Sequence, residues 1–274
     1  MFVHRLLSAL VGIPVGIFLV WQGGLWLAGF VVILGVIAFQ EYHATLRIRR
    51  VEALREIGFP ASAALILGAY FFGGPELLLF TQGVLALAVV SSLAFHLFAP
   101  IEGSRTMSAA ATLLGVVYIG FLFTFTVLVR EMVGPTRTGL PFGLHLFLLA
   151  WLATMAADTV AYAVGKALGK RKLCPAVSPG KTVEGAIGGV LGSMAFALPL
   201  GIWAGFPAGH AIALGALIAV AGLIGDLSKS IIKRDVGVKD FGTLIPGHGG
   251  VLDRFDSLLV SMPVAYFYAI AFLR

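Results

Sequence analysis

The sequence predicts an all-α, polytopic integral membrane protein, a helical bundle with about nine transmembrane helices. Apolar residues make up 59% of its 274 residues and charged residues only 12%, whereas soluble domains have roughly 45–50% and 25%. So few charged side chains do not cover the surface of a soluble domain of this size. Disorder is excluded as well, because it requires low hydrophobicity and high charge.

Long apolar runs separated by short basic loops give the order of the predicted helices. A bilayer core about 30 Å thick requires about 20 helical residues. The third run is short and rich in glycine. The first is interpreted as a retained helix, because no small-residue cleavage site follows it. The nine predicted spans are 6–21, 24–40, 60–73, 77–98, 108–129, 142–165, 183–204, 209–232 and 257–273.

The positions of lysine and arginine predict the topology. With nine crossings, all but three of the 19 basic residues fall on one side of the membrane, and the exceptions are Arg130, Arg137 and Arg274. Basic loops are retained in the cytoplasm. We therefore expect a cytoplasmic amino terminus, and Arg49 and Arg50 are interpreted as topology signals and contacts to anionic lipids.

The candidate functional residues lie in the second half of one membrane domain. Residues 1–150 are expected to be scaffold helices with a basic cytoplasmic loop at 41–59, where Glu41 is expected to cap a helix or to extend to the interface. Residues 151–274 are expected to form the catalytic transmembrane region, with motifs at 158–189 and 226–256. The single cysteine excludes an intramolecular disulfide and a multi-cysteine metal site.

Two carboxylates lie inside predicted spans. Asp158, in span six, is roughly 10 Å from the cytoplasmic end of its helix at 1.5 Å per residue, and Asp226 lies similarly deep in span eight. A charge at this depth is costly unless it is paired, bound to metal or facing water, so a functional role is the first hypothesis. The alternative is a structural ion pair between two helices.

The loop after span six has the composition of an anion site. Five basic residues fall between 166 and 181, and a turn at 178–182 is expected to open the next helix, whose first N–H groups attract phosphate. The segment is not a P-loop, because position 175 is proline where that motif requires glycine. Glu184, one turn after Lys181, is expected to support that lysine or a metal. The glycines at 185, 188, 189 and 192 are expected to pack helices closely.

The end of span eight and the start of span nine form a second polar cluster. Asp226, Ser230 and Lys233 recur at helical spacing, and Asp253 and Asp256 are expected to share a face near a helix start. Carboxylates among basic residues suit magnesium, which takes one or two carboxylates together with substrate phosphates.

These motifs resemble the signature of the phosphatidate cytidylyltransferase, or CDP-diacylglycerol synthase, family. The resemblance covers residues 158–256 without a departure, and for the first 150 residues it is limited to length and hydropathy. Its downstream positions are Ser230, Lys233, Arg234, Lys239, Asp240, Gly242, Pro246, His248, Gly249, Gly250, Asp253, Arg254 and Asp256. Its upstream positions are Asp158, Ala161, Tyr162, Gly165, Lys166, Gly169, Lys170, Ser178, Pro179, Lys181, Thr182, Glu184, Gly185, Gly188 and Gly189.

The resemblance implies a magnesium-dependent transfer of CMP from CTP to phosphatidic acid. The products are CDP-diacylglycerol, for phospholipid biosynthesis, and pyrophosphate. It also implies a bacterial cytoplasmic (inner) membrane location with the active site facing the cytoplasm. A homodimer and a second cation are compatible with it, and no nucleic-acid partner is expected.

The predicted site residues fall into three groups. Asp226 and Asp253 are expected to be the principal metal carboxylates, with Asp256 as a further ligand. The expected catalytic residues are Asp226, Lys233, Arg234, Lys239, Asp240, His248, Asp253, Arg254 and Asp256. The expected substrate-binding residues are Asp158, Tyr162, Ser178, Lys181, Thr182, Glu184, Ser230, Gly249 and Gly250.

Other classes of protein are less consistent with this pattern. A secondary transporter has intramembrane acids and helices broken by glycine, but its site lies near the midplane between inverted repeats. Here the polar residues gather toward one face of the membrane, and no inverted repeat is evident. A CTP-dependent lipid kinase would release CDP in place of pyrophosphate. A pure scaffold requires no carboxylates and lysines on a shared helical face.

Overall fold

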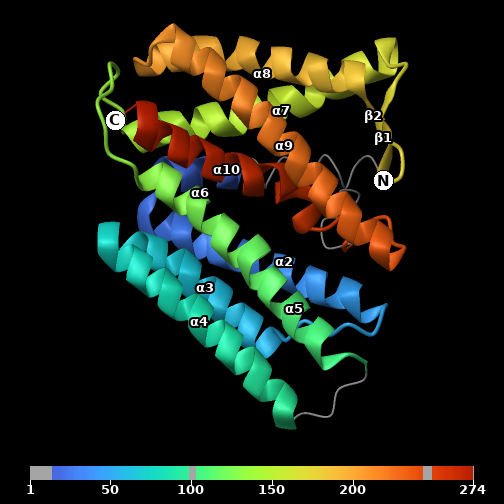
Figure 1. Ribbon diagram of the computed structural model, residues 1–274. Helices are drawn as coiled ribbons and strands as arrows, with labels where there is room; N and C mark the ends of the chain where they lie inside the picture. The colour runs from blue at the N-terminus through green and yellow to red at the C-terminus, as the bar shows by residue number, and fades with distance from the viewer. Residues whose placement is uncertain (1–13, 99–102, 243–248, 274) are drawn as a thin grey trace. The chain divides into compact units, whose positions relative to one another are not determined.

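A computed structural model describes residues 14–98, 103–242 and 249–273. Within them the regular secondary structure is helical apart from one two-stranded hairpin (Figure 1). The chain forms two compact units. Unit 1 contains residues 1–128 and 235–255, and unit 2 contains residues 129–234 and 256–274.

Unit 1 is built from the helices of the first half of the chain. Residues 14–22 are helical. The next helices are α2 (Gly24–Arg47), α3 (Arg55–Phe71), α4 (Gly74–Phe98), α5 (Arg105–Gly115), the π-helical turn η1 (Val116–Phe121) and α6 (Leu122–Glu131). Because α5, η1 and α6 follow one another without a break, they form a single span whose last residues belong to unit 2.

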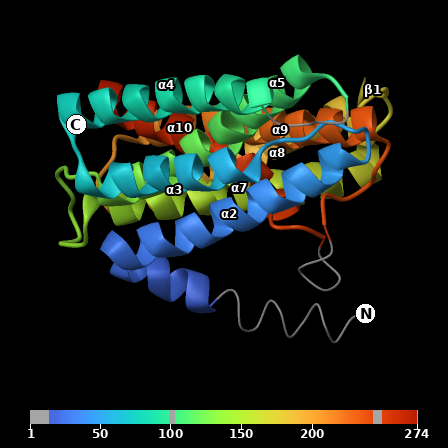
Figure 2. The ribbon, with the colours of Figure 1, turned by 90° about the horizontal axis from the view of Figure 1, so that it is seen from below.

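In unit 1, α3 packs between α2 and α4 (Figure 2). Close packing depends on glycines that face aromatic rings. A Cβ added at Gly58 would overlap the ring of Phe39, and one added at Gly115 would overlap Phe39 and Tyr42. Tyr42 also donates a hydrogen bond to the Ala111 carbonyl, at 3.0 Å, and so ties α2 to α5.

Unit 2 contains the helices of the second half of the chain. Its elements are α7 (Phe142–Leu168), the strands β1 (Lys172–Cys174) and β2 (Ser178–Thr182), α8 (Val183–Ala204), α9 (Ala208–Val236) and α10 (Leu252–Phe272). The last residues of α9 and the first turn of α10 belong to unit 1. Figure 1 shows the hairpin at the end of α7 where α8 begins.

The expected packing of the glycine series in α8 is confirmed. A Cβ at Gly188 would come within 2.7 Å of Val164, and one at Gly192 within 2.6 Å of Val160. A Cβ at Gly189 would lie 2.9 Å from the Ala157 carbonyl oxygen and 3.0 Å from the Ala161 Cβ. Without side chains at these positions, α8 lies directly against α7.

The predicted all-α polytopic membrane fold is confirmed. Seven helices of the described ranges are long and apolar enough to cross a membrane: α2, α4, the α5–α6 span, α7, α8, α9 and α10. Span seven was predicted at the observed bounds of α8. The segment predicted as the third span is helical: it is α3, a 17-residue helix with Pro60 inside it, which is not among these seven helices. The total of nine spans and the orientation of the amino terminus stay predictions, because the first span lies partly outside the described residues.

Two segments differ from the predicted loops. The basic loop expected at 41–59 is helical except for residues 48–54, because α2 and α3 extend beyond their apolar cores. The turn expected at 178–182 is the strand β2. It pairs antiparallel with β1 in the register Lys172↔Thr182 and Cys174↔Ser178, with an irregularity between.

Candidate active site

The hairpin is fixed to the start of α8 by Glu184. Its carboxylate accepts hydrogen bonds from the backbone N–H groups of Lys170, at 3.1 Å, and Arg171, at 3.2 Å. The Arg171 guanidinium lies 3.4 Å away. Glu184 was expected to support Lys181 or a metal, but in the structure it holds the chain between α7 and β1.

Thr182, a predicted substrate residue, caps α8. Its hydroxyl accepts a hydrogen bond from the Gly185 N–H at 3.1 Å, and the residue is buried. This is the ordinary stabilising role of a threonine at a helix N-cap. Gly185 lies where a Cβ would meet the Ala161 carbonyl, so the cap also lies against α7.

Two acids and two lysines of unit 2 form the charged centre of the candidate site. The Lys181 Nζ lies 2.5 Å from Asp226 Oδ2, and the Lys229 Nζ lies 3.0 Å from Asp226 Oδ1. The same Lys229 Nζ lies 2.5 Å from Asp256 Oδ2. We call Lys181, Asp226, Lys229 and Asp256 the acid–lysine cluster. It joins β2, α9 and α10 through side chains that are at most 26% exposed.

A close helix contact brings the acids of the cluster together. A Cβ at Gly225 would overlap the Asp256 carbonyl, and a Cβ at Gly222 would touch Ser257. These two glycines of α9 therefore allow α10 to approach, and Lys229 reaches carboxylates on both helices. Burial of unpaired charge is very costly, so the ion pairs are needed where these helices meet.

Asp158 adds a third carboxylate beside the cluster. Ser257 donates a hydrogen bond to Asp158 Oδ2 at 3.5 Å, and Asp158 interacts electrostatically with Asp226, Lys181 and Lys229. Three carboxylates thus face two lysines, which leaves an excess of negative charge. Unlike Asp256, Asp158 is exposed.

The remaining residues predicted on α9 point to different neighbours. Ser230 donates its hydroxyl proton to the Asp226 carbonyl at 2.8 Å, within α9 itself. Arg234 donates from Nε to the Val177 carbonyl of the hairpin at 3.1 Å. Lys233 is buried.

Asp253 belongs to unit 1, in the first turn of α10. Its Oδ2 accepts hydrogen bonds from the backbone N–H groups of Phe241, at 2.9 Å, and Gly250, at 3.3 Å. Gly249 adopts a φ of 84°, a left-handed conformation that favours glycine. The carboxylate therefore joins the two described ends of the segment that precedes α10.

Several other predicted residues lie on the surface of their units. Lys239, Asp240 and Arg254 are exposed in unit 1. Tyr162 is 71% exposed on α7, with the Lys166 Nζ 5.9 Å from its ring centroid.

Two predicted residues do not belong to this exposed set. Ser178 is half-buried in β2. His248 lies outside the described residues.

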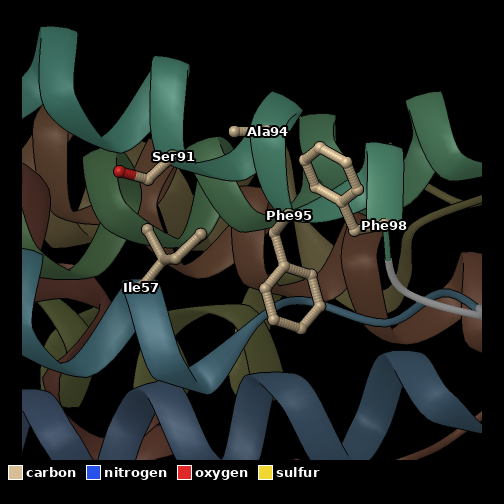
Figure 3. A pocket seen from close by; sticks show the side chains of 5 residues that line it. All are labelled: Ile57, Ser91, Ala94, Phe95 and Phe98. Carbon is tan, nitrogen blue, oxygen red and sulfur yellow. The ribbon is translucent and has the colours of Figure 1, made fainter.

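An apolar groove in unit 1 does not match the charged site. It has a volume of about 570 Å³ and is lined by Ile57 of α3 and by Ser91, Ala94, Phe95 and Phe98 of α4 (Figure 3). It contains no charged side chain, and it therefore does not suit a multiply charged anion.

The sequence analysis did not predict Lys229 as a site residue, although it makes two of the three ion pairs of the acid–lysine cluster. It was counted only among the basic residues that set topology. Its spacing of three from Asp226, with both residues inside an apolar span, is the signal that points to an ion pair. Glu41 was expected to cap a helix or to extend to the interface, and its contacts within unit 1 are described below.

The oxygen donors of unit 2 fit a hard divalent cation only in part. Among residues 14–98, 103–242 and 249–273, no three acidic, histidine or cysteine side chains are grouped as a complete metal site. Magnesium requires fewer protein ligands, because it is commonly held by one or two carboxylates plus substrate phosphates. Asp226, with Asp158 beside it, has the donor type for such shared binding.

The fold and the site define an α-helical integral membrane protein with a charged centre suited to phosphate-bearing ligands. Unit 2 provides both signs of charge: it contains the buried Lys229, the half-buried Lys181, three carboxylates and a basic hairpin beside a helix start. Residues 3–272 of the sequence match the cytidylyltransferase family. The chain belongs to this family, whose members are nucleotidyltransferases, and the resemblance inferred from its motifs is confirmed.

Full-length relatives support the same assignment. The chain is 32% identical to a phosphatidate cytidylyltransferase of Synechocystis, with 98% of this chain and 97% of the relative covered. It is 34% identical to the phosphatidate cytidylyltransferase of Staphylococcus aureus, with 95% and 96% covered. A third relative of that name, from Bacillus subtilis, is 40% identical over 56% of this chain and 55% of its own.

Proposed function

We propose that this enzyme transfers CMP from CTP to phosphatidic acid and forms CDP-diacylglycerol and pyrophosphate. A phosphate oxygen of the lipid attacks the α-phosphorus of CTP, the bond from that phosphorus to the bridging oxygen breaks, and pyrophosphate leaves. The observation that carries the proposal is the acid–lysine cluster beside the basic hairpin, in a chain of this family.

The chain's own charges have separable roles in this reaction. Lys181, which forms an ion pair with Asp226, is assigned to neutralise phosphate at the hairpin. Lys229 is held between Asp226 and Asp256, and it keeps the two carboxylates in place. Positioning and charge neutralisation supply most of the catalysis in such a transfer, and no covalent protein nucleophile is needed.

We further propose magnesium as the divalent cation. Asp226 would hold it, with Asp253 as the second carboxylate assigned from the sequence and Asp256 as a further ligand. When bound, the ion would polarise phosphoryl oxygens and neutralise their charge. Lys233, Arg234, Lys239 and Arg254 are proposed to contact the phosphates of the two substrates. Gly249 and Gly250, with His248 beside them in the sequence, are proposed for nucleotide contact.

The setting of the reaction follows from the charge distribution of the sequence. We place the active site on the cytoplasmic side of the inner membrane, because the basic residues of the hairpin and of the 48–54 loop belong to the side predicted to stay inside. We also propose that residues 1–150 form the scaffold and residues 151–274 the catalytic region, and that the enzyme is a homodimer.

The test uses purified protein in detergent with phosphatidate, magnesium and CTP labelled at either the α- or the γ-phosphate. The α-label is expected in a lipid that mass spectrometry identifies as CDP-diacylglycerol, and the γ-label in pyrophosphate. A lipid kinase would place the γ-label in the lipid and release CDP. A transporter would move substrate into liposomes without forming a product, and either result would overturn the proposal.

A further inference from the structure

One face of α2 holds the backbone that precedes α10. Glu41, Thr45 and Arg49 recur at intervals of four residues, which places them along one side of the helix and its continuation. Each contacts backbone of residues 236–252 in unit 1. Arg49 donates from Nε to the Val236 carbonyl at 3.2 Å, and Thr45 donates its hydroxyl proton to the Phe241 carbonyl at 3.2 Å. We call these three residues the α2 anchor.

Glu41 makes two buried contacts in this set. Its carboxylate accepts hydrogen bonds from the N–H groups of Val251, at 2.9 Å, and Leu252, at 3.0 Å, and the residue is 7% exposed. The first N–H groups of a helix have no partner within the helix, and a carboxylate at this end is favoured by the helix dipole. Glu41 therefore caps α10 from a distant part of the chain.

The backbone is shaped to receive this carboxylate. A Cβ at Gly242 would lie 2.9 Å from Glu41 Oε1, and a Cβ at Gly250 would overlap the same carboxylate. The two glycines flank residues 243–248, which lie outside the described part of the chain. Glycine is needed at both positions because the Glu41 carboxylate occupies the space of a side chain.

The anchor and Asp253 bind the same short stretches of backbone. Asp253 Oδ2 accepts from the N–H of Phe241, whose carbonyl is bound by Thr45. The same oxygen accepts from the N–H of Gly250, next to the Val251 N–H that is bound by Glu41. A shift of either stretch would therefore rotate or displace the Asp253 carboxylate.

We propose that Glu41, Thr45 and Arg49 are positioning residues, which fix residues 236–242 and 249–253 so that Asp253 is held in its working orientation. The inference deepens the proposed function and rests on it for the role of Asp253. Misplacement of a reacting group by about 1 Å can cost about 100-fold in rate, and loss of groups that orient a functional side chain typically costs about 10- to 100-fold.

The central experiment compares Glu41→Gln with Glu56→Gln. Glutamine keeps the volume of Glu41 but replaces one acceptor oxygen with an NH₂ group that faces a backbone N–H. Glu56 is an exposed acid in the first turn of α3, and its substitution makes the same change in charge. The measurements are kcat and KM with both substrates, thermal unfolding, and hydrogen–deuterium exchange of peptides covering 236–242 and 249–253.

Glu41→Gln is expected to lower kcat at least about tenfold, with KM for CTP changed less than kcat. Exchange is expected to rise in the two anchored stretches and to stay unchanged in α3 and α4. Glu56→Gln is expected to match the wild type. Normal kcat in a folded Glu41→Gln protein would overturn the inference, and so would an even rise in exchange across unit 1, which would indicate general destabilisation.

Two further variants keep the test decisive if Glu41→Gln does not fold. Thr45→Val removes only the hydroxyl and is expected to raise exchange at 236–242 and to lower kcat several-fold. Arg49→Gln is compared with Arg50→Gln, the same charge change one residue away, and only Arg49→Gln is expected to lower kcat. Equal effects of the arginine pair, or no effect of Thr45→Val, would contradict the anchor. If the wild type forms no CDP-diacylglycerol, the proposed function fails, while the exchange data still decide whether the anchor exists.

Discussion

Lys181 and Asp226 form an ion pair, with 2.5 Å between the lysine Nζ and the carboxylate Oδ2, that joins the hairpin to α9. The lysine comes from a segment predicted to bind anions, and the acid from the interior of a predicted span. Each is about a quarter exposed. The pair therefore connects a surface loop to a charge inside an apolar helix, and it stands at the centre of the predictions below.

Asp226→Asn is expected to lower kcat by about 100- to 1000-fold, the range seen when one preorganised electrostatic contact is lost from an active site. Asparagine keeps the shape but leaves Lys181 and Lys229 without their shared carboxylate. The assay is CDP-diacylglycerol formation by purified protein, with circular dichroism to verify folding. A rate within a factor of three of wild type would remove Asp226 from the site.

Lys229 and Asp256 should behave as a coupled pair in stability. Both side chains are less than 10% exposed, and removal of one partner from a buried pair costs about 3–5 kcal/mol. Lys229→Met and Asp256→Leu should each lower the unfolding temperature in detergent, and the double variant should lose less than the two losses together. Strictly additive losses would show that the ion pair has no energetic role.

Cys174 provides a native reporter of the hairpin. It is the only cysteine of the chain and lies half-buried in β1. Because Glu184 holds the backbone at Lys170 and Arg171, Glu184→Ala should release β1 and raise the rate of maleimide labelling at Cys174 several-fold. Glu76→Ala, in the first turn of α4, is the control and should leave the rate unchanged. An unchanged rate in Glu184→Ala would show that the hairpin is held by its strand pairing alone.

Two glycine-to-alanine changes should have opposite consequences. Gly192→Ala places a methyl group against Val160 and should separate α8 from α7, at a cost of about 1–3 kcal/mol. Gly83→Ala, in α4, meets open space and should be neutral or slightly stabilising, since alanine is the better helix former. Thermal unfolding of the two variants in the same detergent checks this. Equal unfolding temperatures would falsify the packing role of Gly192.

Chelation of divalent cations should abolish activity without unfolding the protein. Carboxylate oxygens together with substrate phosphates suit magnesium, whereas the packing of the helices depends on apolar contacts and on ion pairs already present. EDTA should therefore reduce CDP-diacylglycerol formation to background, and added magnesium should restore it. The unfolding temperature of the substrate-free protein is the control and should change little. Activity that survives EDTA would rule out the proposed cation.

The fold was predictable where a single local signal marks each element. The bounds of α8 follow from Thr182, which caps its start, and Gly205, whose φ of 96° ends it. The glycine spacing of α8 predicted its contact with α7. The extension of α2 and α3 into residues 41–59 was not predicted. Hydropathy indicates which residues are buried in lipid, but it does not indicate where the backbone hydrogen bonds of a helix end.

The sequence indicated which residues belong to the candidate site, but it did not indicate which of them pair with one another. Asp226 and Lys181 were identified from depth and from the basic loop, yet their pairing joins distant parts of the sequence. Lys229 was missed because a lysine near a span end ordinarily reports topology. Glu184 was expected to support Lys181 or a metal because it follows Lys181 by three residues, and its observed hydrogen bonds come from the backbone N–H groups of Lys170 and Arg171.

The cap that Glu41 provides for α10 has a consequence for recombination within the family. Two segments about 210 residues apart in the sequence form one hydrogen-bonded unit, so neither is a free module. Chimaeras that join the front of one homologue to the back of another should work only where the residues at 41, 45 and 49 are exchanged together with the stretch they hold.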